Sequence, residues 1–139
     1  MKRFLIGGIL ALGTLGSAAS AATTIYECSV STGKAATYGW IKGPVLIARE
    51  DGAAEAKVSD PVTLGVNGKP AVAALKSENS AKVTFGWSLK TKSSSGQNAT
   101  MNYRASIIAS GNKFVITATP LGYANNFRGD GTCKVSRKN

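Results

Sequence analysis

Alternation of apolar and polar side chains is the dominant pattern in the second half of the chain. In AKVTFGWSLK, residues 81–90, every second position is apolar, and lysine, threonine, glycine or serine stands between them. NATMNYRASIIA, residues 98–109, repeats this period of two. Because successive side chains of a strand point to opposite faces, each segment predicts a half-buried β-strand. The polar stretch TKSSSGQ, residues 91–97, predicts the connection between them.

Short polar pairs divide the rest of the chain into further strands. The pairs that predict turns are Asp51–Gly52, Asn67–Gly68, Gly111–Asn112 and Asp130–Gly131. Gly111–Asn112 suits a two-residue hairpin with positive φ, followed by a strand that ends at Pro120. The predicted strands are residues 24–30, 44–50, 53–60, a run that contains Val72 and Leu75, and then residues 81–90, 98–109, 113–120 and 131–136.

These segments predict an all-β protein of about eight antiparallel strands and no helix. The run AAEAK, residues 53–57, has helical propensity, but it is too short to form a stable helix alone and is assigned to a strand. Cys28 lies in the first predicted strand and Cys133 in the last. A small up-and-down β-barrel that closes on itself would permit a bridge between them, and a β-sandwich with neighbouring first and last strands is the alternative.

The first 21 residues, MKRFLIGGILALGTLGSAASA, have the order of a secretory signal peptide: two cations, an apolar run and small residues at the cleavage site. The apolar run is shorter than the ~20 residues that span a bilayer. We therefore expect cleavage after Ala21 and a single domain over residues 22–139, periplasmic or secreted and not membrane-spanning. In an oxidising compartment, two cysteines predict one disulfide, worth roughly 4 to 5 kcal/mol for a loop of about 100 residues.

The charge balance narrows the class of partner. Seventeen Lys and Arg against seven Asp and Glu give +10, and loss of Lys2 and Arg3 with the signal leaves 15 − 7 = +8. An exported protein of this charge is expected to meet an anionic envelope component rather than nucleic acid. The predicted basic surface consists of Lys82, Lys90, Arg104 and Lys113. The alternative is that these side chains only keep the sheet faces from associating.

Candidate catalytic chemistry is sparse. The chain contains no histidine, which removes the usual general base and most zinc or copper sites. Its carboxylates stand singly, mostly beside predicted turns. We therefore expect a non-enzymatic monomer without a metal or cofactor, and a carboxylate-based glycan-active enzyme is the alternative.

Two further ligand sites are suggested by the residue pattern. A stacking or sugar-binding rim would be formed by the aromatic residues of two Gly- and Asn-rich segments, Tyr38, Trp40, Tyr123 and Phe127. The alternative is that Trp40 and Tyr123 close the barrel ends as core residues. A small apolar ligand could occupy the interior beside the small side chains predicted to point inward, Ala81, Ala99, Ala105 and Ala109. FRGDGTC, residues 127–133, contains Arg-Gly-Asp, but Asp130 and Gly131 favour a turn over an adhesion ligand.

Several short motifs together resemble a group of small, functionally uncharacterised secreted or periplasmic bacterial β proteins. They are YECS, GWI followed by PV, TFGWSL, YRAS, PLGY and GTCKV. The resemblance implies secretion, a β fold and the Cys28–Cys133 bridge, and it carries no activity. In size and architecture the chain is also similar to the periplasmic lysozyme-inhibitor barrels. Their target is strongly basic, so a chain of charge +8 would be repelled by it.

Overall fold

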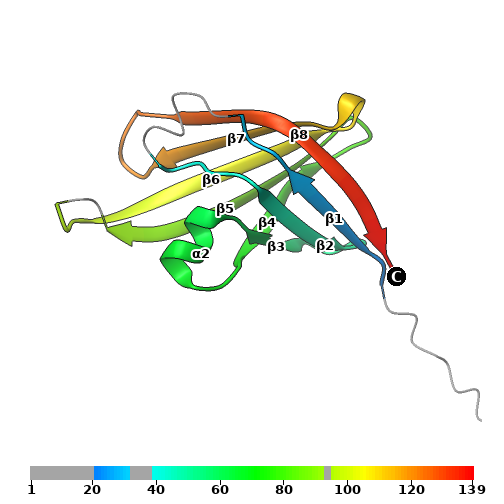
Figure 1. Ribbon diagram of the computed structural model, residues 1–139, viewed down its shortest axis with the longest axis horizontal. Coiled ribbons are helices and arrows are strands. Elements are labelled where there is room, and N and C mark those ends of the chain that lie inside the picture. The colour runs from blue at the N-terminus through cyan, green and yellow to red at the C-terminus, as the bar shows by residue number, and fades with distance from the viewer. Residues whose placement is uncertain (1–20, 32–38, 93–94) are drawn as a thin grey trace, which may run out of the picture.

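Eight antiparallel strands form a closed barrel in the computed structural model, which describes residues 21–31, 39–92 and 95–139. The signal-peptide prediction lies outside the described residues except for Ala21. The strands are β1 (Thr23–Cys28), β2 (Val45–Glu50), β3 (Glu55–Ser59), β4 (Ala71–Glu78), β5 (Lys82–Lys92), β6 (Asn98–Ile108), β7 (Lys113–Pro120) and β8 (Phe127–Lys138). Figure 1 shows them curving around one interior, with the C-terminus at the end opposite the β5–β6 connection.

The barrel closes between its first and last strands. Each strand pairs with its neighbour in sequence, and β1 pairs with β8 in a register that places Cys28 opposite Cys133. These two residues form the disulfide. The predicted up-and-down barrel and its bridge are therefore confirmed, and the β-sandwich is not formed.

The inward-facing residues match the alternation of the sequence. On β5, Val83, Phe85, Trp87 and Leu89 are all buried, while Lys82, Ser88 and Lys90 are exposed. The same alternation on β6 and β7 supplies much of the rest of the core. The largest fully buried apolar side chains of the described residues are Phe85, Phe114, Ile47, Leu89, Met101, Ile116, Val45 and Val58.

The prediction of no helix is wrong, because one short helix, α2 (Pro61–Asn67), follows β3. The carboxylate of Asp60 caps it by accepting hydrogen bonds from the backbone N–H groups of Val62 at 2.9 Å and Thr63 at 3.0 Å. Gly68 ends it in a left-handed conformation at φ 69°, where the sequence predicts a turn. A seven-residue helix carries too little periodicity to stand out from the sequence, and it contacts β3 and β5. No helix among the described residues is long and apolar enough to cross a lipid bilayer.

The hairpin between β6 and β7 differs from its prediction in length. Ile108 and Lys113 are the closing pair, so the connection has four residues instead of two. The predicted positive φ is present at both Gly111 (78°) and Asn112 (49°). The β2–β3 connection turns at Asp51 and Gly52, as predicted.

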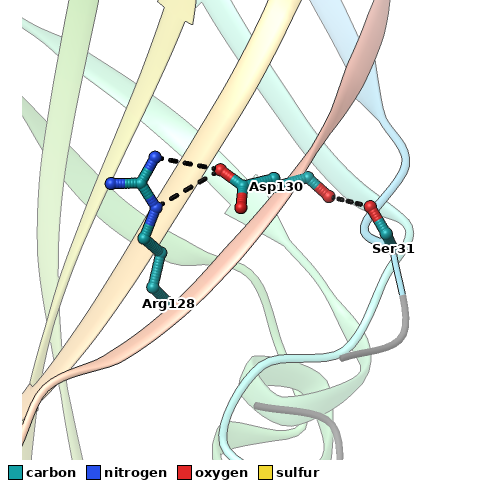
Figure 2. A network of polar contacts seen from close by, with 3 residues as sticks. All are labelled: Ser31, Arg128 and Asp130. Atoms are coloured by element: carbon teal, nitrogen blue, oxygen red, sulfur yellow. Dashed lines mark hydrogen bonds and ion pairs between the residues drawn. The ribbon is translucent and has the colours of Figure 1, made fainter. Parts of the chain in front are cut away.

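The predicted turn at Asp130 and Gly131 is wrong, because both residues lie inside β8. Asp130 pairs with Val115 on β7, and on its other side its carbonyl oxygen accepts the hydroxyl of Ser31 at 2.6 Å. Figure 2 shows this contact and, on the other side of the strand, the carboxylate of Asp130 facing the Arg128 guanidinium at 3.2 Å. Pairing on both sides outweighs the local turn preference, and Arg-Gly-Asp lies along a strand instead of at a loop tip.

Two glycines allow this part of β8 to approach its neighbours closely. A Cβ at Gly131 would overlap the carbonyl oxygen of Ser29, which continues the β1 pairing. A Cβ at Gly129 would lie 2.8 Å from Val30 and 3.1 Å from Ile41, side chains that fill the barrel interior. Glycine at these positions is therefore a packing requirement at the barrel closure.

Removal of the disulfide is expected to lower the free energy of unfolding by about 2 to 5 kcal/mol, because the bridge restricts the unfolded chain over a sequence separation of 105 residues. Urea unfolding of residues 22–139 with Cys28→Ser and Cys133→Ser measures this loss. Dithiothreitol should destabilise the wild type and leave the double variant unchanged. Equal stability of variant and oxidised wild type would contradict the prediction.

Gly131→Ala is expected to destabilise the barrel by about 1 to 3 kcal/mol, because the added Cβ meets backbone atoms of Ser29 that cannot rotate away. Gly65→Ala is the matched control, since Gly65 lies inside α2 with no atom within 4 Å of a built Cβ. Alanine has the higher helix propensity, so this control should gain about 0.5 to 1 kcal/mol. If the denaturant midpoints of Gly131→Ala and Gly65→Ala do not shift in opposite directions, the close approach of Gly131 to Ser29 is contradicted.

Candidate functional site

Three of the four predicted aromatic residues, Trp40, Tyr123 and Phe127, lie at one end of the barrel, which also carries α2 and is called here the helix end. The β1–β2 and β7–β8 connections both lie there because the strands alternate in direction. Trp40 is half-buried and packs against the core, as does Phe127, which begins β8 instead of lying in the loop. Tyr123 is 67% exposed, and Tyr38 lies outside the described residues. Of the three residues of the predicted rim that the structure describes, two pack against the core, and Tyr123 is the one whose aromatic ring is exposed to solvent.

A buried aromatic pair lies inside the barrel near Trp40. The rings of Trp87 and Tyr103 stack with centroids 5.4 Å apart, and the Tyr103 hydroxyl donates to the carbonyl oxygen of Trp40 at 2.8 Å. Burial raises the pKa of Tyr103, and the nearby Asp60 carboxylate raises it further. The indole Nε1 of Trp87 is buried and has no hydrogen-bond partner among the described residues. This pair ties the segment around Trp40 to the barrel wall.

The predicted basic residues share one outer surface, formed by the outward side chains of β5, β6 and β7 and called here the basic face. Lys82 and Lys113 flank Ile108 on three adjacent strands. Arg104 and Lys90 lie farther toward the helix end on the same side of the sheet. Lys92 adds a fifth cation, and the three strands contain no aspartate or glutamate.

Carboxylates on the neighbouring strands are already paired with other cations. Glu78 at the end of β4 binds Arg49, and Asp130 on β8 binds Arg128. None of the five cations of the basic face is in an ion pair within residues 21–31, 39–92 and 95–139. These five cations are therefore not neutralised by a direct ion pair within the described part of the chain.

A shallow groove crosses the basic face and opens to solvent. Its volume is about 330 Å³. The residues that line it are Lys76, Gly86, Trp87, Ser88, Asn102, Tyr103, Arg104, Thr117 and Thr119. Arg104 was a predicted site residue, whereas Lys76 and the polar side chains were not. The sequence feature that could have indicated the groove was Gly86, because a glycine in the middle of a strong strand pattern indicates that another group approaches the strand closely.

The interior is occupied by side chains where the sequence suggested room for an apolar ligand. Ala105 is fully buried among them, and Ala99 is half-buried. Ala81 and Ala109 are exposed in the connections at the end opposite α2, so the prediction that they point inward is wrong. The fully buried side chains of Phe85 on β5 and Phe114 on β7 fill the barrel interior instead.

Several carboxylates are engaged in local structural interactions. Asp60 is used as the cap of α2, and Asp51 pairs with Arg137. Across the described part of the chain, no group of three His, Cys, Asp or Glu side chains could hold a metal ion.

No protein-family model, no curated protein and no solved structure matches this chain. The resemblance to the small exported bacterial proteins therefore stays a prediction, and the function has to be argued from the surface chemistry.

The raised pKa of Tyr103 predicts a loss of stability in strong base. Unfolded tyrosine ionises near pH 10, whereas the folded protein holds Tyr103 protonated to higher pH, so the unfolded state releases its proton first. The free energy of unfolding should therefore fall as pH rises above about 10, by up to 1.4 kcal/mol per pH unit from this group. Tyr103→Phe should flatten the slope measured by urea unfolding between pH 9 and pH 11.5, and an identical slope in the variant would contradict the assignment.

Proposed function

We propose that this is an exported, non-enzymatic binding protein that attaches through its basic face to an anionic component of the cell envelope. The observation that carries the proposal is the charge distribution of the barrel wall. Five cations project from β5, β6 and β7, and these strands hold no carboxylate. The described carboxylates lie on the other strands or on the connections outside this sheet.

Clustering of this kind favours a polyanionic partner over a single small ion. Lys82 and Lys113 lie on the two sides of Ile108, about two strand spacings or roughly 10 Å apart, and Lys90 extends the positive region toward the helix end. Several cations on one rigid sheet can contact several negative groups at once, so weak individual attractions add. A basic residue near an anionic membrane surface contributes about 1 kcal/mol.

The surface proposal accounts for the charge pattern better than the interior-ligand alternative does. Large side chains such as Phe85 and Phe114 fill the barrel, so an apolar ligand would have to displace them. A protective role for surface lysines would not require all carboxylates to be absent from three adjacent strands. The signal-peptide pattern and the disulfide support a location in the envelope or outside the cell.

Charge reversal on the basic face should weaken binding more than the same reversal elsewhere. Lys82→Glu with Lys113→Glu removes two attractions of about 1 kcal/mol each, which corresponds to at least about 30-fold lower affinity. The control is Lys57→Glu with Lys134→Glu, two exposed outward lysines of β3 and β8 with the same change in charge.

The measurement is co-sedimentation of residues 22–139 with vesicles that contain phosphatidylglycerol, at 50 and 150 mM salt. Neutral phosphatidylcholine vesicles should not bind the protein. The proposed surface is supported if the Lys82 and Lys113 variant loses binding while the control variant retains most of it. Equal losses in both variants would show that only the net charge matters and would overturn the proposal.

A further inference from the structure

We infer that the groove over Gly86 is a phosphate-group site, in which Lys76 and Arg104 hold one phosphate of the anionic partner. This inference rests on the proposed function and gives the basic face a specific point of recognition. The groove is separate from Lys82 and Lys113, which lie near the opposite end of the same strands.

The position of Lys76 depends on an irregularity in β4. The pairing of β4 with β5 shifts register between Leu75 and Ser77, so Lys76 is the extra residue of a bulge. Its aliphatic chain lies across Gly86 on β5: a Cβ built at Gly86 would be 2.7 Å from Lys76 Cε and 3.2 Å from Cγ. The missing side chain of Gly86 therefore makes the space in which the lysine lies flat on the sheet.

Arg104 is the next cation along this line. It is the direct cross-strand partner of Gly86 on β6, so the residue that Lys76 covers is paired with Arg104. Lys76 on β4 and Arg104 on β6 therefore approach Gly86 from the two strands that flank β5. In the described part of the chain neither Lys76 nor Arg104 forms an ion pair, and the groove contains no carboxylate. A bound anion would be attracted by both cations.

The remaining walls of the groove supply neutral donors. The Ser88 hydroxyl donates to Asn102 Oδ1 at 2.7 Å, which leaves the amide NH₂ of Asn102 as a donor. Thr117, the β7 partner of Arg104, and Thr119, the partner of Asn102, add hydroxyl groups. The residues that line this groove thus carry an ammonium, a guanidinium, an amide and hydroxyl groups. This set fits the several acceptor oxygens of a tetrahedral phosphate better than the two oxygens of a carboxylate.

The groove is large and open enough for a phosphate carried on a larger molecule. Its volume of about 330 Å³ exceeds that of a single phosphate group, and it is open to solvent. Because it opens on the barrel wall, a phosphate ester can enter while the rest of its molecule extends over the basic face. Phosphate groups of this kind occur both on lipid headgroups and on soluble phosphate esters, and the experiment separates these sources.

The first experiment titrates ¹⁵N-labelled residues 22–139 with inorganic phosphate, glycerol phosphate and acetate at constant ionic strength. The amide of Gly86 and the Nε–H of Arg104 should shift saturably with both phosphates and respond at least tenfold more weakly to acetate. Shifts that spread over all lysines without saturation, or equal affinity for acetate, would overturn the phosphate site.

The groove variants are Lys76→Met and Gly86→Ala, the second of which keeps every charge. Its new methyl group meets only the flexible Lys76 chain, so the fold should persist and the lysine should be displaced. Each variant should lower phosphate affinity at least tenfold. Lys113→Met, which removes an exposed cation of the same face outside the groove, should change it less than twofold. If Gly86→Ala binds phosphate like the wild type, or Lys113→Met weakens binding as much as Lys76→Met, the site is wrong.

Vesicle binding separates this inference from the proposed function. If the groove variants bind phosphate and phosphatidylglycerol vesicles like the wild type, while reversal of Lys82 and Lys113 abolishes vesicle binding, the basic face stands and the groove site fails. If the groove variants lose both soluble phosphate and vesicles, the groove recognises the lipid phosphate. If they lose soluble phosphate and keep vesicle binding, the groove is a site for soluble phosphate esters.

Discussion

Pairing of β1 with β8 is the interaction on which the rest of the structure depends. It joins the first and last strands, removes both sheet edges and places Cys28 opposite Cys133, where the disulfide holds the closure. The contact continues beyond β1, because the backbone N–H groups of Ser29 and Ser31 donate to carbonyl oxygens of β8. Closure of the barrel therefore explains why Asp130 and Gly131 form part of a β-strand although their sequence favours a turn. It also explains why Gly131 has no room for a side chain.

A closed barrel of this size divides the side chains into two sets with different roles. The inward set is used for packing, with Phe85, Phe114 and the stacked pair of Trp87 and Tyr103 filling the interior. The outward set faces solvent, and the proposed binding surface lies within it. On β5, β6 and β7 that set is basic and free of carboxylates, and the acidic residues on either side are paired with Arg49 and Arg128. The wall of the barrel thus has an electrostatic polarity around its circumference.

Glycines inside strands mark the places where this wall departs from a regular sheet. Gly129 and Gly131 allow β8 to approach the β1 side of the closure, so their role is packing. Gly86 faces outward and accommodates a lysine from the bulge in β4. The same residue type therefore supports closure at one position and shapes a surface groove at another. The two roles differ in what lies against the glycine, which is a packed segment of the core in the first case and a surface lysine in the second.

The period-two pattern by itself determined the strands β5 and β6, their buried faces and the exposure of Lys82, Lys90 and Arg104, because alternation within one strand is a local property. The strand β7, which begins at the exposed Lys113, was predicted from the turn signal of Gly111 and Asn112 and the run that ends at Pro120. The two cysteines and their positions near the ends of the domain likewise predicted the bridge. The short helix was missed because Asp60 and Gly68 act as caps only once the chain between them turns. The tertiary structure alone decided that Asp130 and Gly131 lie in a strand, that Trp40 packs against the core and that Lys76 lies across Gly86, the strand partner of Arg104. Each of these depends on which strand is the neighbour and in what register, and those contacts join residues far apart in the chain.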